Sequence, residues 1–428
     1  GDGLAIARLL SEKGWKVNVI ACFDENSTLS PDAETNLEKL PKEDSLINWK
    51  VFSLSKDAIF IDAFLGVGLK RELRDEARQI IKKFNSFQGI KIAVDIPSGL
   101  KAEEIGVQDV VRADFTITFA FPKLALLLPE NSDFVGDLQV IDIGINESLY
   151  REFDSSYFFI QRKDIPYLHW RFNRFSHKGD FGKILLVGGS PGKMGAVVMA
   201  SKSALRTGAG LVSVHIEESE RLIIQTAVPE AMATWGLIPN PEFYDAIGIG
   251  PGWGMEQRKI LLETLFTNFQ KPIVLDADAL NVLARNPELL EKIPANSILT
   301  PHIGEFERLV AKTKNHLERM AQARIFAQKY QLILILKGAN TLISLPDGRQ
   351  LFNSSGSPYM ATGGAGDALT GMVTAYLGMG YSPENAAICG VFHHGLAGEL
   401  AGSINRRGTI ASDIIEMIPD TYRVLGID

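Results

Sequence analysis

Residues 183–216 read KILLVGGSPGKMGAVVMASKSALRTGAGLVSVHI, and this stretch decides the fold of the second half of the chain. The apolar run Lys183–Val187 predicts a buried strand, and a glycine-rich loop and a helical pattern over Gly195–Thr207 follow it. A glycine turn then leads into a second apolar run, Leu211–Ile216. A strand, a crossover helix and another strand form the unit from which parallel sheets are built, so we expect an α/β fold.

The same alternation extends in both directions. In the second half, strands are expected at 246–249, 273–275 and 332–336, with a hairpin over 341–353 and a glycine-studded helical tail. The first third predicts strands at 16–22, 58–62, 91–95, 115–119 and 138–143, with helices at 4–12 and 74–84. The rhythm breaks between these regions, so we expect one α/β domain over residues 1–150, a linker over 151–175 and a second domain over 176–428.

Composition excludes several classes of protein. The 428 residues carry a net charge of −7, which argues against a large surface that binds nucleic acid. With only Cys22 and Cys389, neither a disulfide scaffold nor a cysteine zinc site can form, which favours a reducing compartment; we expect a cytoplasmic protein. No apolar run is long enough to span a membrane. The chain opens on Gly1 without a methionine, so we expect a leader or a piece of the first domain to be missing upstream.

Two carboxylates follow strands of the first domain. Asp62 precedes the loop that contains Gly66, Val67 and Gly68, and Asp95 precedes Pro97-Ser98-Gly99. Ligands of open α/β sheets bind beyond the carboxyl ends of strands, which makes both residues candidates for a site. The alternative is that they only cap turns. The glycine pair is a weak dinucleotide signal, because Arg71 stands where a third glycine belongs.

Two glycine-rich loops mark the second domain. The loop from Gly188 to Met194 is one residue too short for a Walker A motif and lacks its Ser or Thr, although its backbone could still approach a polar ligand. The run Thr362-Gly363-Gly364-Ala365-Gly366-Asp367 precedes a helical pattern, so its amides can form an anion hole. Asp367 could then accept a proton from a substrate hydroxyl during phosphoryl transfer, or it could simply cap the helix.

Three further polar clusters end apolar strands of the second domain. They are Asp276-Ala277-Asp278, Thr300-Pro301-His302 with Glu305, and Lys337-Gly338-Ala339-Asn340-Thr341. Lys337 could pair with nucleotide phosphate, or it could be a solvated residue at a strand end. His393 and His394 lack the spacing of a zinc helix, so we expect them to be structural.

On these motifs the chain resembles the bifunctional NAD(P)H-hydrate repair enzymes, in which an epimerase domain precedes an ADP- or ATP-dependent (S)-NAD(P)H-hydrate dehydratase domain. The resemblance covers nearly the whole chain. It implies a Rossmann-like three-layer first domain and a ribokinase-like second domain. Gly1-Asp2-Gly3-Leu4 resembles the end of an N-N-G-G-D-G-L motif whose leading asparagines are absent here, and Val67 replaces a frequent threonine.

The resemblance also implies roles for individual residues. In the dehydratase, Asp367 would be catalytic, and the substrate would contact Ala196, Gly252, His302 and Asp367. The adenine nucleotide would bind Lys337, Gly338, Ala339, Asn340, Thr341 and Gly366. In the epimerase, Asp95 would handle the proton, the substrate would contact Gly66, Val67, Gly68, Leu69, Lys70, Arg71, Glu72 and Asp95, and potassium would bind Asp62 and Ser98.

The function expected from this resemblance is repair of hydrated NADH and NADPH (NADHX and NADPHX). The expected cofactors are ADP or ATP, Mg²⁺ and K⁺, and we expect a homo-oligomer that binds neither nucleic acid nor membrane. The alternative is a ribokinase-like small-molecule kinase whose N-terminal half is a non-catalytic binding or oligomerisation module, because the same glycine loop and aspartate would serve a kinase.

Overall fold

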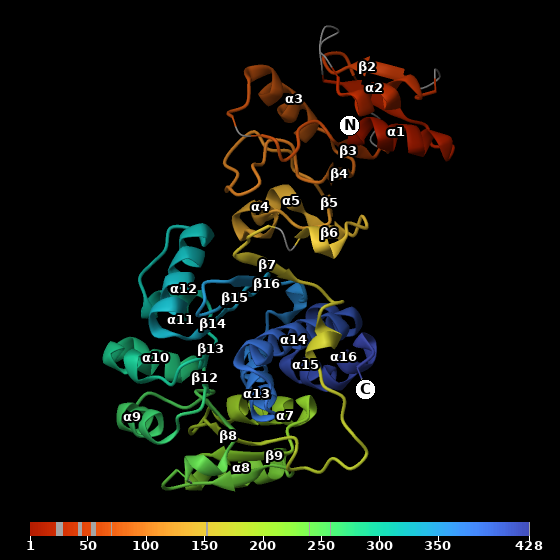
Figure 1. Cartoon of the computed structure of the whole chain (residues 1–428). Helices are drawn as coiled ribbons and strands as arrows, with labels where there is room; N and C mark the ends of the chain where they lie inside the picture. The colour runs from red at the N-terminus through yellow and green to blue at the C-terminus, as the bar shows by residue number, and fades with distance from the viewer. Residues whose placement is uncertain are drawn as a thin grey trace. The chain divides into compact units, whose positions relative to one another are not determined.

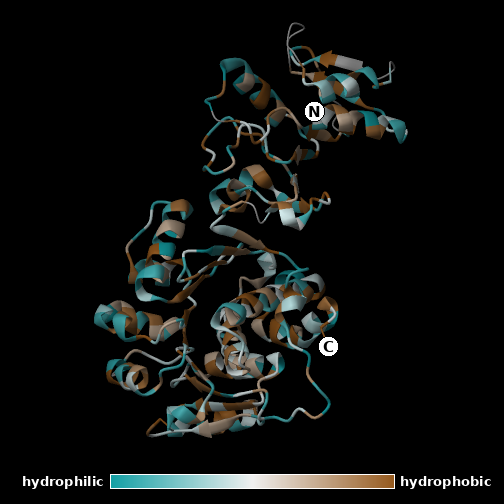
Figure 2. Ribbon diagram, in the orientation of Figure 1, coloured by the Kyte–Doolittle hydropathy of each residue, from teal (hydrophilic) through white to brown (hydrophobic). Residues whose placement is uncertain are grey.

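The computed structural model describes residues 1–22, 29–41, 45–52, 57–69, 71–150, 153–238, 240–256 and 258–427. The chain divides into two compact units, Gly1–Asp154 and Ser155–Asp428 (Figure 1). Ribbons coloured by hydropathy show the apolar residues gathered on the strands and on the inner sides of the helices (Figure 2). Each unit therefore has its own core.

Unit 1, Gly1–Asp154, contains two parallel sheets. Strands β3 to β6 form the larger one in sequence order, and β1 pairs with β2 in the smaller one. The strands are β1 (Asn18–Ala21), β2 (Ser45–Asn48), β3 (Phe60–Asp62), β4 (Lys91–Val94), β5 (Phe115–Phe119) and β6 (Asp137–Ile141). The helices are α1 (Asp2–Glu12), α2 (Pro31–Glu38), α3 (Asp75–Asn85), α4 (Leu124–Leu127), α5 (Ser132–Val135) and α6 (Glu147–Tyr150).

Unit 2, Ser155–Asp428, is built on a ten-stranded sheet in the order β10-β9-β8-β11-β12-β13-β14-β15-β16-β7. Pairing is parallel except for the antiparallel β14-β15-β16 segment, which contains the expected hairpin. The strands are β7 (Tyr157–Ile160), β8 (Lys183–Val187), β9 (Leu211–His215), β10 (Met232–Thr234), β11 (Ala246–Ile249), β12 (Ile273–Leu275), β13 (Ile298–Leu299), β14 (Ile333–Leu336), β15 (Leu342–Ser344) and β16 (Gln350–Asn353).

Helices cover both faces of this sheet, with α9 to α12 on one side and α7 and α13 to α16 on the other (Figure 1). They are α7 (Met194–Thr207), α8 (Arg221–Ala227), α9 (Arg258–Asn268), α10 (Ala277–Arg285), α11 (Ile303–Leu309), α12 (His316–Tyr330), α13 (Ala365–Gly378), α14 (Pro383–Asn405), α15 (Ala411–Glu416) and α16 (Ile418–Leu425).

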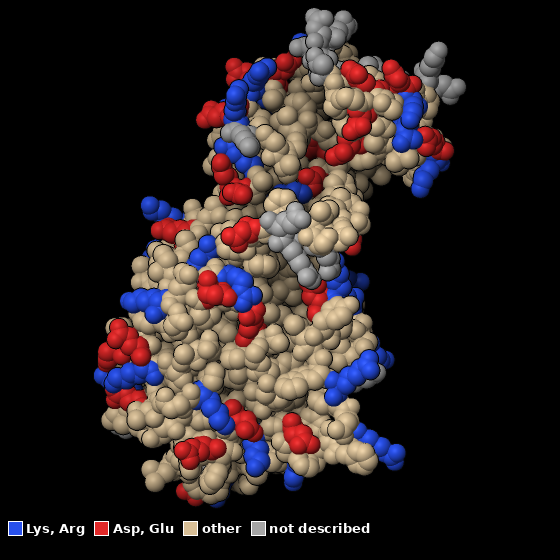
Figure 3. Space-filling view, viewed as in Figure 1, with Lys and Arg blue, Asp and Glu red and all other residues tan. Residues whose placement is uncertain are grey.

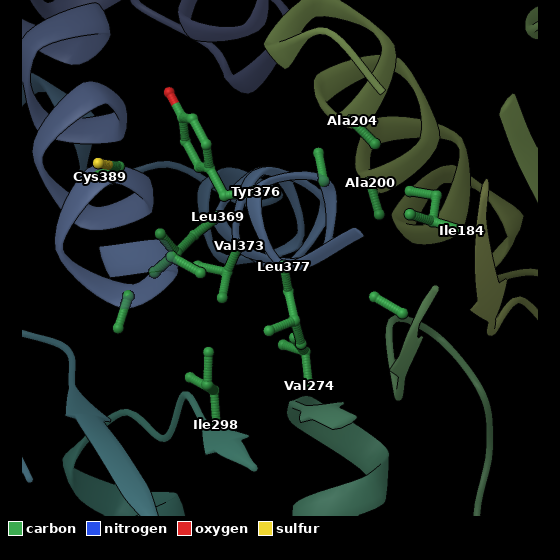
Figure 4. Packing of buried hydrophobic residues seen from close by; sticks show 14 of the residues in the cluster. Ile184, Ala200, Ala204, Val274, Ile298, Leu369, Val373, Tyr376, Leu377 and Cys389 are labelled. Carbon is green, nitrogen blue, oxygen red and sulfur yellow. The ribbon is translucent and has the colours of Figure 1, made fainter. Parts of the chain in front are cut away.

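Helix α13 lies at the centre of the unit 2 core. Its residues are apolar or small on every side, as is typical of a helix surrounded by protein. Figure 4 shows Val373 and Leu377 on the side that faces Val274 and Ile298 of the sheet. On the opposite side α13 packs against α7, where a Cβ at Gly371 would lie 2.0 Å from the carbonyl oxygen of Ala200. A glycine is therefore required at this close approach.

Part of the segment expected as a linker, residues 151–175, is folded into unit 2. Strand β7 pairs in parallel with β16, and Ile165 is fully buried. The short run Tyr157–Ile160 is apolar and aromatic but is flanked by charges, which is why the sequence pattern did not indicate a strand. The division between the units falls between Asp154 and Ser155.

Candidate functional site

The carboxyl ends of the central strands of unit 2 bring together the polar clusters singled out in the sequence. Asp276 follows β12, and Lys337 follows β14. The Nζ of Lys337 donates a hydrogen bond to Oδ1 of Asp276 at 2.9 Å and lies 3.9 Å from Oε2 of Glu305. A parallel bridge joins His302 to Lys337. Lys337 is thus paired with carboxylates of this polar cluster, and its ammonium is mostly shielded from solvent.

Asp276 is buried and is held from two directions. Besides Lys337, the hydroxyl of Thr370 donates to Oδ2 of Asp276 at 2.6 Å. Burial lowers the pKa of the Lys337 ammonium, but the charges of Asp276 and Glu305 outweigh this effect and raise that pKa. Sequence reasoning missed Thr370, although its position three residues after Asp367 on one helix is a usable signal.

Asp367 lies in the first turn of α13. The N-cap residue of this helix is Gly364, and no side chain caps it, so capping is not the role of Asp367. Among the described residues, the backbone N–H groups of 363–367 donate no hydrogen bond. Burial raises the pKa of Asp367 to about 7, with a further contribution from the charge of Asp276 and an opposing one from Lys337. A carboxylate and a set of available amides therefore stand together at a positive helix end.

His302 begins α11 as its N-cap. Its Nδ1 accepts hydrogen bonds from the N–H groups of Gly304 at 3.0 Å and Glu305 at 3.3 Å, while Glu305 Oε2 accepts one from the N–H of His302 at 2.9 Å. Because Nδ1 acts as an acceptor, a neutral ring carries its proton on Nε2. The side chain is 56% exposed, so this N–H can reach a ligand.

The loop after β11 contains Gly252 and brings it next to Ala196, the other predicted substrate residue in this part of unit 2. A Cβ at Gly252, whose φ is +60°, would lie 3.1 Å from the Cβ of Ala196 on α7. The N–H of Gly254 donates to Oδ2 of Asp278 at 2.8 Å. Ala196 and Gly252 are thus neighbours, and the loop leads directly to the carboxylate cluster.

The segment from Lys337 to Thr341, predicted to hold nucleotide, turns back on itself next to the glycine loop. The Thr341 hydroxyl donates to the Gly338 carbonyl at 3.0 Å. A Cβ at Gly366 would lie 3.3 Å from Nζ of Lys337, so Gly366 and Lys337 are adjacent. Ala339 and Asn340 lie within this turn.

In unit 1, Asp62 and Ser98 form one buried cluster. Ser98 donates to Asp62 through its N–H at 2.7 Å and through its hydroxyl at 2.6 Å, and its Oγ accepts from the N–H of Leu65 at 2.8 Å. Burial raises the pKa of the Asp62 carboxyl, although the hydrogen bonds from Ser98 oppose this shift. Asp62 therefore does not only cap its own turn but also binds the loop that contains Ser98.

Asp95 has a φ of +68°, a strained conformation for a residue with a side chain. Its Oδ1 accepts hydrogen bonds from the Thr118 hydroxyl at 3.1 Å and the Phe119 N–H at 3.2 Å, and it forms an ion pair with Lys123. Sequence reasoning missed Thr118 and Lys123. The signal available was the place of Thr118 at the end of β5, the neighbour of the strand that precedes Asp95, and that of Lys123 five residues after Thr118, at the start of α4.

A cleft of about 360 Å³ in unit 1 includes two of the predicted substrate residues, Leu69 and Glu72, together with Cys22 and Trp49. Gly66, Val67, Gly68 and Arg71 belong to the same loop, whereas Lys70 lies outside the described residues. Among the described residues, Asp95 does not line this cleft.

Two features are absent from the described residues. No cluster of three or more His, Cys, Asp or Glu side chains is arranged to hold a metal ion. None of the helices is both long enough and apolar enough to cross a bilayer.

Comparison with known proteins agrees with this geometry. Residues 184–420 match the family model described as NAD(P)H-hydrate dehydratase, and residues 1–125 match that of the YjeF-related protein N-terminus. A bifunctional NAD(P)H-hydrate repair enzyme of Moorella thermoacetica is 34% identical over 99% of this chain and 86% of its own length.

Solved structures match unit 2. The ADP/ATP-dependent NAD(P)H-hydrate dehydratase from Bacillus subtilis, co-crystallised with ATP and Mg²⁺, aligns with 63% of this chain and 98% of its own at 28% identity and a TM-score of 0.56. A ribokinase-like superfamily protein from Enterococcus faecalis aligns with 64% of this chain and 98% of its own at 23% identity and a TM-score of 0.56, which shows the fold alone.

The fold and the polar cluster of unit 2 define a ribokinase-like α/β enzyme. The matches over both units go further: the chain belongs to the family of bifunctional NAD(P)H-hydrate repair enzymes.

Proposed function

We propose that this chain restores NADH and NADPH from their hydrates. Unit 2 dehydrates the S hydrate at the expense of ADP or ATP, and unit 1 interconverts the R and S hydrates. The observation that carries the proposal is the position of Asp367, a carboxylate whose pKa is raised to about 7 beside the available amides of residues 363–367.

In the dehydration, Asp367 accepts the proton of the substrate hydroxyl while the hydroxyl oxygen attacks the terminal phosphorus of the nucleotide, whose phosphoanhydride bond breaks to release AMP from ADP or ADP from ATP. The amides of the glycine loop and the ammonium of Lys337 stabilise the charge on the moving phosphoryl group. Phosphate then leaves with the C–O electron pair, the neighbouring ring carbon loses a proton to water, and the C–H electron pair restores the ring double bond. Phosphorylation is needed because hydroxide is a poor leaving group.

Binding roles follow the geometry. His302 donates its Nε2–H to the substrate, whose ring lies against Ala196 and Gly252. The nucleotide lies along Lys337, Gly338, Ala339, Asn340 and Thr341, with its phosphates at Gly366.

The carboxylates around Lys337 fit a magnesium–nucleotide complex. Mg²⁺ is usually held by one or two carboxylates together with substrate phosphates, and Asp278 and Glu305 can supply these carboxylates without a dedicated protein cage. When bound, Mg²⁺ neutralises phosphate charge.

In unit 1, we assign proton transfer during epimerisation to Asp95, positioned by Thr118 and Lys123, and substrate binding to the loop from Gly66 to Glu72. The hydroxyl of Ser98, the carboxylate of Asp62 and the carbonyl of Leu65 bring oxygen ligands together, because the Ser98 hydroxyl lies 3.2 Å from that carbonyl. This donor set suits K⁺, which would offset the buried charge of Asp62 and order the loop.

Location and assembly are also part of the proposal. The two free thiols, Cys22 and Cys389, support a cytoplasmic location. Highly exposed apolar side chains on unit 2, among them Tyr167 and Phe175, support a homo-oligomer, which sedimentation of the full chain would test.

The proposal is tested by incubating the full chain with a mixture of R and S hydrates and either ADP or ATP, while following reduced-nicotinamide absorbance and free phosphate. Complete conversion with equal release of phosphate is expected. A plateau at the S fraction would remove the epimerase assignment, provided that spontaneous epimerisation is slow. A stable phosphorylated product without recovery of absorbance would instead identify a kinase. Omitting K⁺ should slow only the conversion of the R fraction.

A further inference from the structure

Unit 2 also contains a cleft, which lies at the carboxyl ends of β8 and β9 and has a volume of about 370 Å³. None of the predicted site residues lines it. Its lining combines glycine backbone, two indoles and a few charged groups. The residues are Gly188, Gly189, His215, Ile216, Glu217, Glu218, Trp235, Gly236, Trp253 and Arg258.

The loop of residues 250–254 links this cleft to the proposed dehydratase site. The N–H of Gly189 donates to the carbonyl of Pro251 at 2.8 Å, and Trp253 lines the cleft. The next residue, Gly254, donates to Asp278, which belongs to the carboxylate cluster around Asp367. One five-residue loop therefore borders both the cleft and the catalytic carboxylates.

The charged residues that line the cleft are Glu217, Glu218 and Arg258, so the lining has no excess of positive charge. Arg258 lies 3.5 Å from Glu217, and Arg221, which does not line the cleft, lies 3.9 Å from Glu218. A cleft built for a phosphate would carry an excess of positive charge, so this one suits an uncharged polar group.

The aromatic and polar groups indicate which uncharged group fits. Trp235 is 41% exposed and lines the cleft with the Arg221 guanidinium 6.0 Å from its ring, which leaves its other face for stacking. Trp253 is buried, with the Arg258 guanidinium 5.2 Å from its ring. The Nε of Arg258 is buried and has no hydrogen-bond partner among the described residues. A purine ring stacks on an indole, ribose hydroxyls donate to a carboxylate such as Glu217, and a buried N–H lacking a partner requires an acceptor.

We propose that this cleft binds the adenosine end of the NADH hydrate, whose adenosine ribose carries no 2′-phosphate, while the nicotinamide end of that substrate lies at Asp367. Trp235 stacks on the adenine, Glu217 accepts hydrogen bonds from the ribose, and Arg258 Nε donates to an acceptor on the nucleoside. The inference rests on the proposed function for its substrate, and it assigns the substrate a second point of attachment.

The test compares two substrates of the full chain, the S hydrate of NADH and the S hydrate of reduced nicotinamide mononucleotide, which lacks adenosine. Trp235→Ala should lower kcat/KM about tenfold for the dinucleotide and leave the value for the mononucleotide unchanged. Leu237→Ala is the matched control, because this side chain is 94% exposed and does not line the cleft. Equal losses on both substrates, or no loss on either, would overturn the inference.

A direct binding measurement separates this inference from the proposed function. In equilibrium dialysis without ADP, labelled adenosine should bind the wild-type chain and the Leu237→Ala variant at a second site besides the nucleotide site, and Trp235→Ala should weaken binding at that second site about tenfold. If the wild type dehydrates neither hydrate, the proposed function fails. The dialysis still tests whether the cleft binds adenosine. Absence of adenosine binding at a site other than the ADP site would reject the inference that the cleft binds adenosine. Trp235→Phe, which keeps an aromatic face, should restore most of the binding.

Discussion

At the scale of single residues, the environment of Asp367 is unfavourable for its charged form and favourable for catalysis. A base with a pKa of about 7 is roughly half deprotonated at neutral pH and accepts a proton readily. We expect Asp367→Asn, which preserves shape, to lower kcat of the dehydratase at least ~10²-fold while nucleotide affinity changes little. Stopped-flow absorbance and ADP titration calorimetry measure the two quantities. Turnover equal to that of the wild type would exclude Asp367 as the base.

The same carboxylate should reduce stability in a pH-dependent way. A folded-state pKa above the unfolded value of 3.8 means that the folded chain binds the proton more tightly, so stability is lost as pH rises towards 7. Asp367→Asn should therefore raise the free energy of unfolding by about 1–3 kcal/mol at pH 8 and have little effect at pH 4. Urea denaturation at both pH values tests this prediction, and an equal change at the two would contradict it.

Lys337 should be important for both stability and nucleotide binding. Its removal leaves Asp276 buried without its cation, a change that typically costs ~3–5 kcal/mol. We expect Lys337→Met to lower the melting temperature and to weaken ADP binding in titration calorimetry. Lys193→Met is the control, because Lys193 is 58% exposed and lies 3.7 Å from Asp278. If the two variants have the same melting temperature and the same affinity for ADP, Lys337 neither stabilises Asp276 nor binds the nucleotide.

At the scale of elements, the start of α13 depends on space at one glycine. A methyl group at Gly366 would lie 3.3 Å from Nζ of Lys337, whereas one at Gly363 would meet no atom within 4 Å. We therefore expect Gly366→Ala to displace the ammonium and raise the Kd for ADP several-fold, with little effect on folding because a lysine end can move. Gly363→Ala should bind ADP like the wild type. Similar affinities for the two variants would show that Gly366 does not face the nucleotide.

The elements also show which features the sequence can predict. The strands Lys183–Val187 and Phe115–Phe119 were predicted with their observed bounds, because the first is an apolar run that ends at a glycine loop and the second consists of β-branched and aromatic residues. The polar residue after each strand predicted that the site lies at the carboxyl ends of the strands. Lys123 and Thr370 were missed because their partners, Asp95 and Asp276, are distant in sequence, and such contacts depend on how strands and helices pack.

At the scale of the whole molecule, the segment that opens unit 2 is fastened to its last helices by a buried polar cluster. His169 Nε2 lies 3.1 Å from Nε2 of His393 on α14, whose Nδ1 lies 2.6 Å from the hydroxyl of Thr421 on α16. The hydroxyl of Tyr381 lies 2.9 Å from Nδ1 of His169. The contact between the two Nε2 atoms needs one donor and one acceptor, so at least one ring is neutral.

This cluster makes unit 2 sensitive to acid. Burial lowers the pKa of His169 to about 4 and that of His393 to about 3, below the unfolded value of 6.5. The unfolded chain then binds more protons, so stability is lost as pH falls below 6.5, and His393 alone should cost about 2 kcal/mol at pH 5.

His393→Gln removes this titration, so the fall in the free energy of unfolding between pH 7 and pH 5 should be smaller by about that amount, even if the variant is less stable at pH 7. His177→Gln, a change on a side chain that is 74% exposed, should keep the wild-type pH dependence. The decisive quantity is the slope of the unfolding free energy against pH, because a purely structural defect shifts the curve without altering its slope. A wild-type slope in His393→Gln would mean that this histidine is not what links the fold of unit 2 to pH.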